Sequence, residues 1–260
     1  MPRHNRNMNT AGLYTLIERE IKRMFRVVVQ TLVSPWISAL LYILIFGLVV
    51  GSRISSIGGV SYIDFVLPGL VMMNIIQSAF AHSSSSVYFA RFTRQIEEVL
   101  VSPLSYMEMI IGYTLGGVVR GIVVGIGVYA IAIFFTVATI EHLFLFLLYA
   151  TAVSAIFSLL GILVGLWADG FEQLSVLSVF VITPLTFIGG VFNTTEMLPP
   201  ALKIIAHANP FFYFVDGLRY AMIGFSESNM FVGALLTGGL LVGLLVLVQH
   251  LFKIGYKVRL

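Results

Sequence analysis

Long runs of apolar residues alternate along this chain with short polar segments. The runs approach or exceed the roughly 20 residues that a helix needs to cross the hydrocarbon core of a bilayer. Only helices fit them, because lipid offers the backbone no hydrogen-bond partner and the runs lack the alternation of a barrel strand. The pattern predicts an all-α polytopic membrane protein with six transmembrane helices, over residues 31–51, 64–82, 109–136, 143–168, 174–192 and 230–251.

The composition supports this class. Hydrophobic residues make up 58% of the chain and charged residues 10%, against about 25% charged residues in an average soluble domain. The absence of cysteine excludes disulfides, thiol catalysis and cysteine metal clusters. The first 30 residues are too polar for the core of a signal peptide, so we expect the first span itself to target the chain.

Basic residues are unevenly distributed over the predicted loops. Eleven of the 15 Lys and Arg residues fall on one side of this topology, against Arg53, Lys203 and Arg219 on the other, and Arg120 lies within the third span. Because positive residues stay in the cytoplasm, both termini are expected there. We interpret the basic patches as contacts with lipid headgroups rather than with nucleic acid.

The start of the first span and the end of the last span divide the chain into three parts. Residues 1–30 are expected to form a cytoplasmic N-terminus with an amphipathic interfacial helix over 13–30, residues 31–251 the six-helix domain, and residues 252–260 a basic cytoplasmic tail. The interfacial helix is predicted from apolar residues at helical spacing beside a basic stripe. The apolar set is Leu13, Leu16, Ile17, Ile21, Met24 and Val28, and the basic set is Arg19, Lys22, Arg23 and Arg26.

A charged segment at 91–103 separates the second and third spans. Phe92, Ile96, Val99 and Leu100 recur at the spacing of one helix face, which predicts a short amphipathic helix that ends at Pro103. Ser105 and Glu108 then have the spacing of a capping box at the start of the third span. A docking surface for another protein and an ordinary solvated turn both fit this segment.

Glycines are spaced as GxxxG in the third, fourth and sixth spans, and we favour packing within the chain over a dimer seam. Arg120 lies among the glycines of the third span, where a charge is costly and usually faces protein or water. The sequence names no partner for Arg120, because Asp169 and Glu172 lie in a cytoplasmic turn.

The segment between the fifth and sixth spans is interrupted by proline. Pro199 and Pro200 can open one short helix, and Asn209 with Pro210 breaks it before a second over 211–223. These pieces are too short to span a bilayer. We predict external re-entrant half-helices over 199–223, buried against protein.

Catalytic and metal-binding motifs are missing from the sequence. There is no GxxxxGK[ST] phosphate loop, no HExxH and no GxSxG, and the five histidines are scattered. We therefore predict no enzyme activity, no catalytic residues and no metal site in this chain.

One polar constellation lies in the second span. Asn74, Gln77, Ser78 and His82 share a helix face, and Pro184 is expected to kink the fifth span. Polar side chains in hydrocarbon face a bundle interior, another helix or a water-filled path. The sequence does not decide whether these side chains form hydrogen bonds between helices or line a path for a substrate.

Three segments resemble the type-2 ABC exporter permeases, in order and at the spacing of that family. They are QIEEVLVSPLSYMEMIIGYTLGG at 95–117, FIGGVFNTTEMLPP at 187–200 and NPFFYFVDGLRYAM at 209–222. The subgroup most similar to the chain exports drugs, lipo-oligosaccharides and nodulation factors. The resemblance implies a dimer of permeases, here a homodimer, and two copies of a separate cytoplasmic ABC ATPase that binds ATP and Mg, so this chain itself holds no cofactor.

The resemblance also assigns roles to residues. The family's cytoplasmic coupling helix falls on 91–103 and its second and fifth spans face the dimer axis, which favours a path lined by Asn74, Gln77, Ser78, His82 and Pro184. The implied interface with the ATPase consists of Arg91, Arg94, Glu97, Glu98, Val99 and Pro103.

These expectations favour one function and leave two alternative functions. The chain is expected to export an amphiphilic drug, lipid or lipid-linked saccharide across a bacterial inner membrane, using ATP hydrolysed by the partner. One rival is a proton-coupled secondary transporter with His82 or Arg120 as the relay. The other is a scaffold subunit of a membrane complex that transports nothing.

Overall fold

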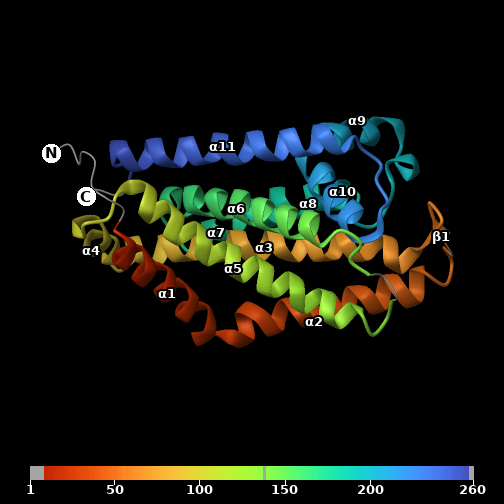
Figure 1. Cartoon of the computed structure of the whole chain (residues 1–260), viewed down its shortest axis with the longest axis horizontal. Helices are drawn as coiled ribbons and strands as arrows, with labels where there is room; N and C mark the ends of the chain where they lie inside the picture. Colours follow the sequence, from red (N-terminus) through yellow and green to blue (C-terminus); the bar gives the residue numbers. More distant parts are fainter. Residues whose placement is uncertain (1–8, 55, 137–138, 258–260) are drawn as a thin grey trace.

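The computed structural model describes residues 9–54, 56–136 and 139–257 (Figure 1). Residues 1–8 of the expected N-terminal part and 258–260 of the expected tail lie outside this range. The described chain is an all-α polytopic membrane protein with one small hairpin, β1 (Ser56–Ile57) and β2 (Val60–Ser61). The helices are α1 (Thr10–Arg26), η1 (Val29–Val33), α2 (Ser34–Tyr42), η2 (Ile43–Val50), α3 (Tyr62–Phe92), α4 (Gln95–Val101), α5 (Tyr106–Ala132), α6 (Leu143–Trp167), α7 (Gln173–Leu177), η3 (Ser178–Ile182), α8 (Thr183–Ile188), η4 (Thr195–Met197), α9 (Pro200–Ala208), α10 (Pro210–Ile223) and α11 (Met230–Ile254).

Five helices in the described part of the chain are long and apolar enough to cross a bilayer. They are Val29–Gly47, Tyr62–Phe92, Tyr106–Ala132, Leu143–Trp167 and Met230–Ile254. The fifth predicted span, 174–192, is shorter than expected and runs over Gln173–Ile188. It ends early because Gly190 adopts a positive φ of 84°, a conformation that glycine tolerates and that a helix cannot continue.

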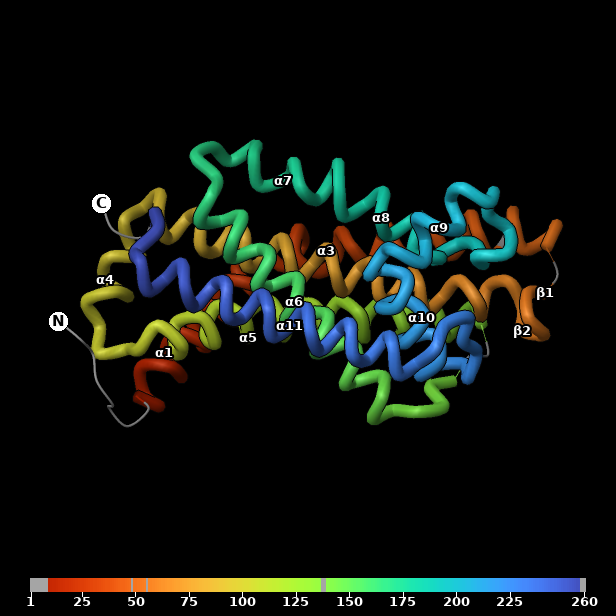
Figure 2. The backbone as a smooth tube through the Cα atoms, turned by 90° about the horizontal axis from the view of Figure 1, so that it is seen from above, coloured from red at the N-terminus to blue at the C-terminus, as the bar shows by residue number. Residues whose placement is uncertain are grey.

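Helix α3 forms the centre of the bundle. It lies between α6 and α5 in Figure 1 and between α7 and α11 in Figure 2, and 83% of its most apolar window is buried. Glycines permit this packing: a Cβ at Gly121 of α5 would lie 2.7 Å from Oγ of Ser154, and one at Gly161 of α6 would lie 2.6 Å from the carbonyl oxygen of Phe80. The prediction that these glycines pack within the chain is confirmed.

The last span differs from the others. Only 17% of the most apolar window of α11 is buried, and a Cβ at Gly239 or Gly243 would meet no atom within 4 Å. The packing interpretation therefore does not extend to α11, whose glycines lie on an open face of the protomer.

The two ends of the bundle are built differently. Helices α1 and α4 lie at one end, with both ends of the described chain near them, and α9 and α10 lie toward the other (Figure 1). Asn209 separates α9 from α10; its Oδ1 accepts from the amide of Phe211 and its Nδ2 donates to the carbonyl of Leu185. The predicted break at this residue is confirmed.

Candidate functional site

The predicted cytoplasmic segment 91–103 forms three pieces rather than one helix. Helix α3 continues to Phe92, the chain turns, and α4 then runs for seven residues. Arg94 makes the turn with a left-handed φ of 60°, which a right-handed helix cannot contain without strain. The structure therefore corrects the bounds of the predicted helix to Gln95–Val101.

Two apolar residues attach α4 to the bundle. Ile96 and Val99 are buried in a cluster with residues of α1, α3, α5, α6 and α11. Val99 was predicted to contact a partner protein, but in this protomer its side chain packs inward. Phe92 was expected on the packed face and is 73% exposed, because the turn at Arg94 separates it from α4.

The other face of α4 is exposed. Glu97 and Glu98 lie on it, and Arg94 just before α4 and Pro103 just after it are exposed as well, so four of the six residues predicted to bind a partner are accessible. Val101 adds an apolar side chain that is 81% exposed. The structure thus presents two carboxylates beside apolar surface at the end of the bundle, on a helix held from behind.

Arg91 joins three segments instead of facing outward. Its Nη1 donates to the carbonyl oxygens of Gly165 and Ala168 at 2.9 and 3.0 Å, and its Nε donates to that of Lys257 at 2.9 Å. Nζ of Lys257 donates to Oδ1 of Asp169 at 2.7 Å, and this hydrogen bond lowers the pKa of the Asp169 carboxyl group. Arg91 therefore fixes the end of α3, just before the turn into α4, to the end of α6 and to the C-terminal segment.

A buried carboxylate holds α1 against α3. Oε2 of Glu20 accepts from Oγ of Ser86 at 2.6 Å and lies 3.3 Å from Nε2 of His82 and 3.4 Å from Nε of Arg23. Oε1 lies 3.2 Å from Nη2 of Arg19. Burial opposes ionisation of Glu20, but the hydrogen bond with His82 and the charge of Arg23 outweigh it and lower the pKa of the carboxyl group to about 2.

Sequence reasoning missed Glu20. The residue lies one turn from Leu16 and one turn from Met24, which are both buried, so it belongs to the packed face of α1 rather than to the polar one. Gly116 of α5 makes the room, since a Cβ there would lie 2.7 Å from Cβ of Glu20. The spacing of four residues between apolar neighbours was the available signal.

The predicted polar face of α3 is mostly enclosed within the protomer. Asn74, Ser78 and His82 are buried, and Nδ2 of Asn74 donates to the carbonyl of Leu70 in its own helix at 2.9 Å. Gln77 is partly accessible. The path assignment of these residues stays a prediction, and in this protomer their burial suits packing between helices.

A narrow strip of α3 nevertheless remains accessible. Gln77, Ala81, Ser85 and Phe89 are the positions of residues 77–89 that are not buried, and they recur every four residues. Such spacing places them on one side of a helix. Nη1 of Arg23 lies 3.3 Å from Oγ of Ser85 and so reaches this strip from α1.

Pro184 lies where the predicted fifth span changes its helix type. The π-helical turn η3 precedes α8, and Oγ1 of Thr183 donates to the carbonyl of Ser178 at 2.9 Å. A wider turn accommodates the ring and the missing amide of proline. The helix type thus changes next to Pro184; the kink predicted there and its place beside a path stay predictions.

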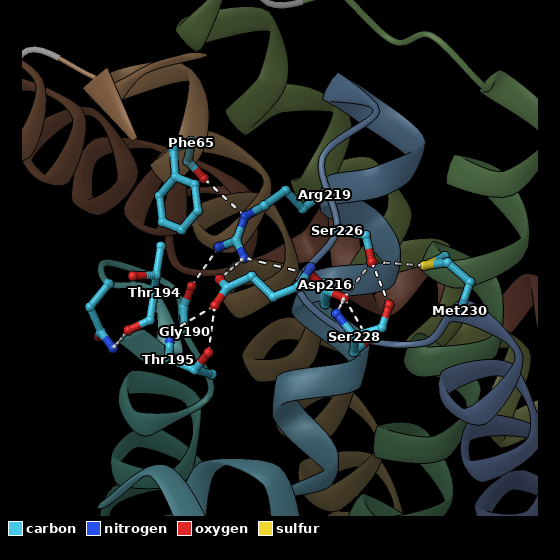
Figure 3. Close-up of polar contacts among 11 residues, drawn as sticks. Phe65, Gly190, Thr194, Thr195, Asp216, Arg219, Ser226, Ser228 and Met230 are labelled. Atoms are coloured by element: carbon cyan, nitrogen blue, oxygen red, sulfur yellow. Dashed lines mark hydrogen bonds and ion pairs between the residues drawn. The ribbon is translucent and has the colours of Figure 1, made fainter. Parts of the chain in front are cut away.

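A second charged cluster occupies the opposite end of the bundle. Arg219 is fully buried, with its guanidinium carbon 3.9 Å from the ring centre of Phe65 (Figure 3). Its Nε donates to the carbonyl of Phe65 at 3.3 Å and its Nη2 to that of Gly190, while Nη1 lies 4.0 Å from Asp216 and 3.6 Å from Glu227. The cluster joins α3, the loop after α8 and α10.

Asp216 fixes the loop that leads into α11. Its carboxylate accepts from the amides of Glu227 and Ser228 at 2.9 Å each, and from the hydroxyls of Ser226 and Ser228 (Figure 3). Glu227 in turn accepts from the amide and hydroxyl of Thr195. The charges of this cluster thus lie against one another and against groups of the same chain, which is the arrangement of a structural contact.

Among the described residues, no group of three or more His, Asp or Glu side chains could hold a metal ion. What the structure offers is an exposed acidic helix at one end, joined through packed residues to the central helix of the bundle.

Known proteins resemble this chain over most of its length. The model of a family described as ABC-2 type transporter matches residues 11–223. The inner membrane transport permease YadH of Escherichia coli (strain K12) is 42% identical over 216 residues, which cover 83% of this chain and 84% of that protein. Nodulation protein J of Rhizobium meliloti (strain 1021) is 25% identical over 209 residues, 76% of each chain.

Proposed function

The chain belongs to the ABC-2 type transporter family, and we propose that it is the permease subunit of an exporter driven by a separate cytoplasmic ATPase. It is a transmembrane transporter subunit, and its relative YadH is named as an inner membrane permease. The proposal adds the coupling to ATP, the cytoplasmic position of both termini, a homodimer of permeases with two ATPase copies, and an amphiphilic cargo such as a drug, a lipid or a lipid-linked saccharide.

The exposed face of α4 is the observation that carries this proposal. Glu97 and Glu98 face away from the bundle, whereas Ile96 and Val99 on the same short helix are packed into it. A seven-residue helix has little stability of its own, so a force on its outer face acts on whatever its inner face contacts.

The mechanism follows from these attachments. When ATP closes the two ATPases, they displace α4. The contacts of Ile96 and Val99 carry the displacement to α3, and the hydrogen bonds of Arg91 carry it to α6 and the C-terminal segment. The cargo moves along the accessible strip of α3, which faces the second permease, and enters that space laterally from the cytoplasmic leaflet.

Charge reversal on α4 tests the proposal. Glu97→Lys combined with Glu98→Lys should reduce co-purification of an ATPase with this chain by at least tenfold and abolish coupled hydrolysis, while the amount of folded permease stays the same. Glu196→Lys is the matched control, since Glu196 is exposed near the other end of the bundle. Unchanged ATPase binding and hydrolysis in the double variant would remove α4 from the mechanism.

One observation favours the rival, a proton-coupled transporter. His82 and Glu20 form a buried pair of titratable groups, with Nε2 and Oε2 3.3 Å apart. The rival predicts transport that survives depletion of ATP and stops when the proton gradient is collapsed; the proposed exporter shows the opposite pair of responses.

A further inference from the structure

Arg120 lies on the face of α5 that meets α1. One turn earlier, a Cβ at Gly116 would lie 2.7 Å from Glu20 and 2.8 Å from His82. One turn later, the carbonyl of Val124 accepts a hydrogen bond from Nε1 of Trp36 at 3.2 Å. Arg120 is therefore placed near the point where the interfacial helix passes into the first span.

No described residue is a partner for Arg120. Its guanidinium makes no hydrogen bond or ion pair with the described chain, and its Nε is buried without an acceptor. The charge that acts on it most is that of Arg23, which has the same sign. An unpaired guanidinium inside a membrane span is costly, and such groups normally mark the position of a counter-ion or ligand.

The chain does not supply a carboxylate that could pair with Arg120. All 12 Asp and Glu residues lie in the described part of the sequence. Glu20 is already shared among Arg19, Arg23 and His82. Within the five long spans, the acidic residues are Asp64 and Glu108, each in the first turn of its helix.

A second copy of the chain does not change this balance. Two permeases related by an axis along the membrane normal place each residue at the same depth, so the acidic residues of the partner's long spans also lie at its helix ends, and its Glu20 is shared as in this protomer. The missing anion must therefore come from a molecule other than this chain.

We propose that Arg120 and Arg23 bind the anionic headgroup of an amphiphile from the cytoplasmic leaflet, through its phosphate. A guanidinium donates paired hydrogen bonds that match phosphate oxygens, and phosphate is the common anion at the membrane surface. A cavity of about 300 Å³ between α1 and α3 is lined by two carboxylates, Glu18 and Glu20, and by four basic side chains, Arg19, Lys22, Arg23 and Arg26, so positive charge is in excess. These basic side chains favour entry of an anion between the two helices.

Lipid titration tests the site without any ATPase. A fluorescent phosphatidylglycerol is titrated into the full-length chain in neutral detergent. Arg120→Gln should weaken its apparent affinity about tenfold, the equivalent of one lost charge-assisted hydrogen bond, and Arg120→Lys should restore part of it. Arg53→Gln is the control, since Arg53 is exposed beside the external hairpin, and it should bind as the wild type does.

The variant is expected to remain folded, because it removes an unpaired charge. Added phosphatidylglycerol should raise the thermal unfolding midpoint of the wild-type chain more than that of Arg120→Gln, and phosphatidylcholine should not distinguish them. Equal affinity for phosphatidylglycerol in wild type and Arg120→Gln, or an equal loss in Arg53→Gln, would overturn the proposal.

A second measurement identifies the source of the headgroup. In proteoliposomes that contain the permease with its ATPase, ATP-dependent movement of the labelled lipid to the opposite leaflet would make the bound amphiphile a cargo. Binding without movement would make it a resident lipid. Only this cargo assignment rests on the proposed function; if no ATPase binds, the titration still decides whether the site exists.

Discussion

Arg219 and Arg120 are two arginines of a membrane protein, the first fully buried and the second partly accessible, and their surroundings are opposite. Around Arg219, two carbonyl oxygens, an aromatic ring and two carboxylates of the same chain surround the guanidinium. Around Arg120, the described chain supplies no acceptor. The chain itself thus supplies the charged neighbours of Arg219, whereas Arg120 has no such neighbour of opposite charge among the described residues.

The same contrast applies to acidic residues. Asp216 is buried with four hydrogen-bond donors, while Glu97 and Glu98 are exposed. A charge that is satisfied inside the chain stabilises the fold, and a charge that is left accessible is available to a partner. This difference separates the structural cluster of this permease from its candidate functional surface.

The largest expected effect comes from opening the charged cluster around Arg219. Arg219→Gln leaves Asp216 and Glu227 without their cation, and breaking a buried ion pair costs about 3–5 kcal/mol. The thermal unfolding midpoint in detergent should fall by on the order of 10 °C. Arg53→Gln is again the control. A wild-type midpoint for Arg219→Gln would show that the external end is not held by this cluster.

An intermediate effect is expected at Glu20. Glu20→Gln removes the anion shared by Arg19, Arg23 and His82, which should cost about 1–3 kcal/mol and release α1 without unfolding the bundle. Trypsin should then cleave α1 faster than in the wild type. Glu18→Gln, which breaks only the exposed pair with Lys22, should change cleavage little; equal cleavage of both variants would contradict the role of Glu20.

The pH dependence of α1 follows from the same carboxylate. Its pKa falls from an ordinary 4.5 to about 2 in the folded chain. A lowered pKa means that the stabilisation is complete above pH 4.5 and is lost as the pH falls toward 2. In the wild type, amide exchange in α1 should therefore be faster at acidic pH than at neutral pH, after correction for intrinsic exchange rates. In Glu20→Gln this increase at acidic pH should be absent.

The smallest change in stability is expected at Gly239 on the open face of α11, and Gly116 in the packed α5 is the comparison. Gly116→Ala places a methyl group 2.7 Å from Glu20 and should destabilise the α1–α5 contact by about 1–3 kcal/mol. Gly239→Ala meets no atom within 4 Å and should be neutral or slightly stabilising, because alanine favours helix more than glycine does. Thermal unfolding measures both; a large loss in Gly239→Ala would contradict the open face of α11.

Local signals in the sequence predicted the elements well where chemistry and spacing agree. Ser105 and Glu108 form the expected capping box, with both side-chain-to-backbone hydrogen bonds present. Pro200 and Pro210 each lie in the first turn of a helix, as expected of proline. Such features depend on neighbours within a few residues, which the sequence displays directly.

Features that depend on distant contacts were not predictable. The second span was predicted to end at residue 82, but the serines at 83, 84 and 86 are buried and α3 continues to Phe92. Burial of Glu20 depends on Gly116, which lies far away in the sequence. The inward direction of Arg91 and Val99 depends on the turn at Arg94, for which an arginine gives no signal.

The central claim is that the outer face of α4 binds an ATPase. The chain has no cysteine, so a single Glu97→Cys substitution carries one cross-linker without background. The account predicts that Glu97→Cys in native membranes cross-links to a soluble subunit with a phosphate-binding loop, and that Glu196→Cys does not. The account would be contradicted if Glu97→Cys cross-linked to no such subunit, or if Glu97→Cys and Glu196→Cys cross-linked to it equally.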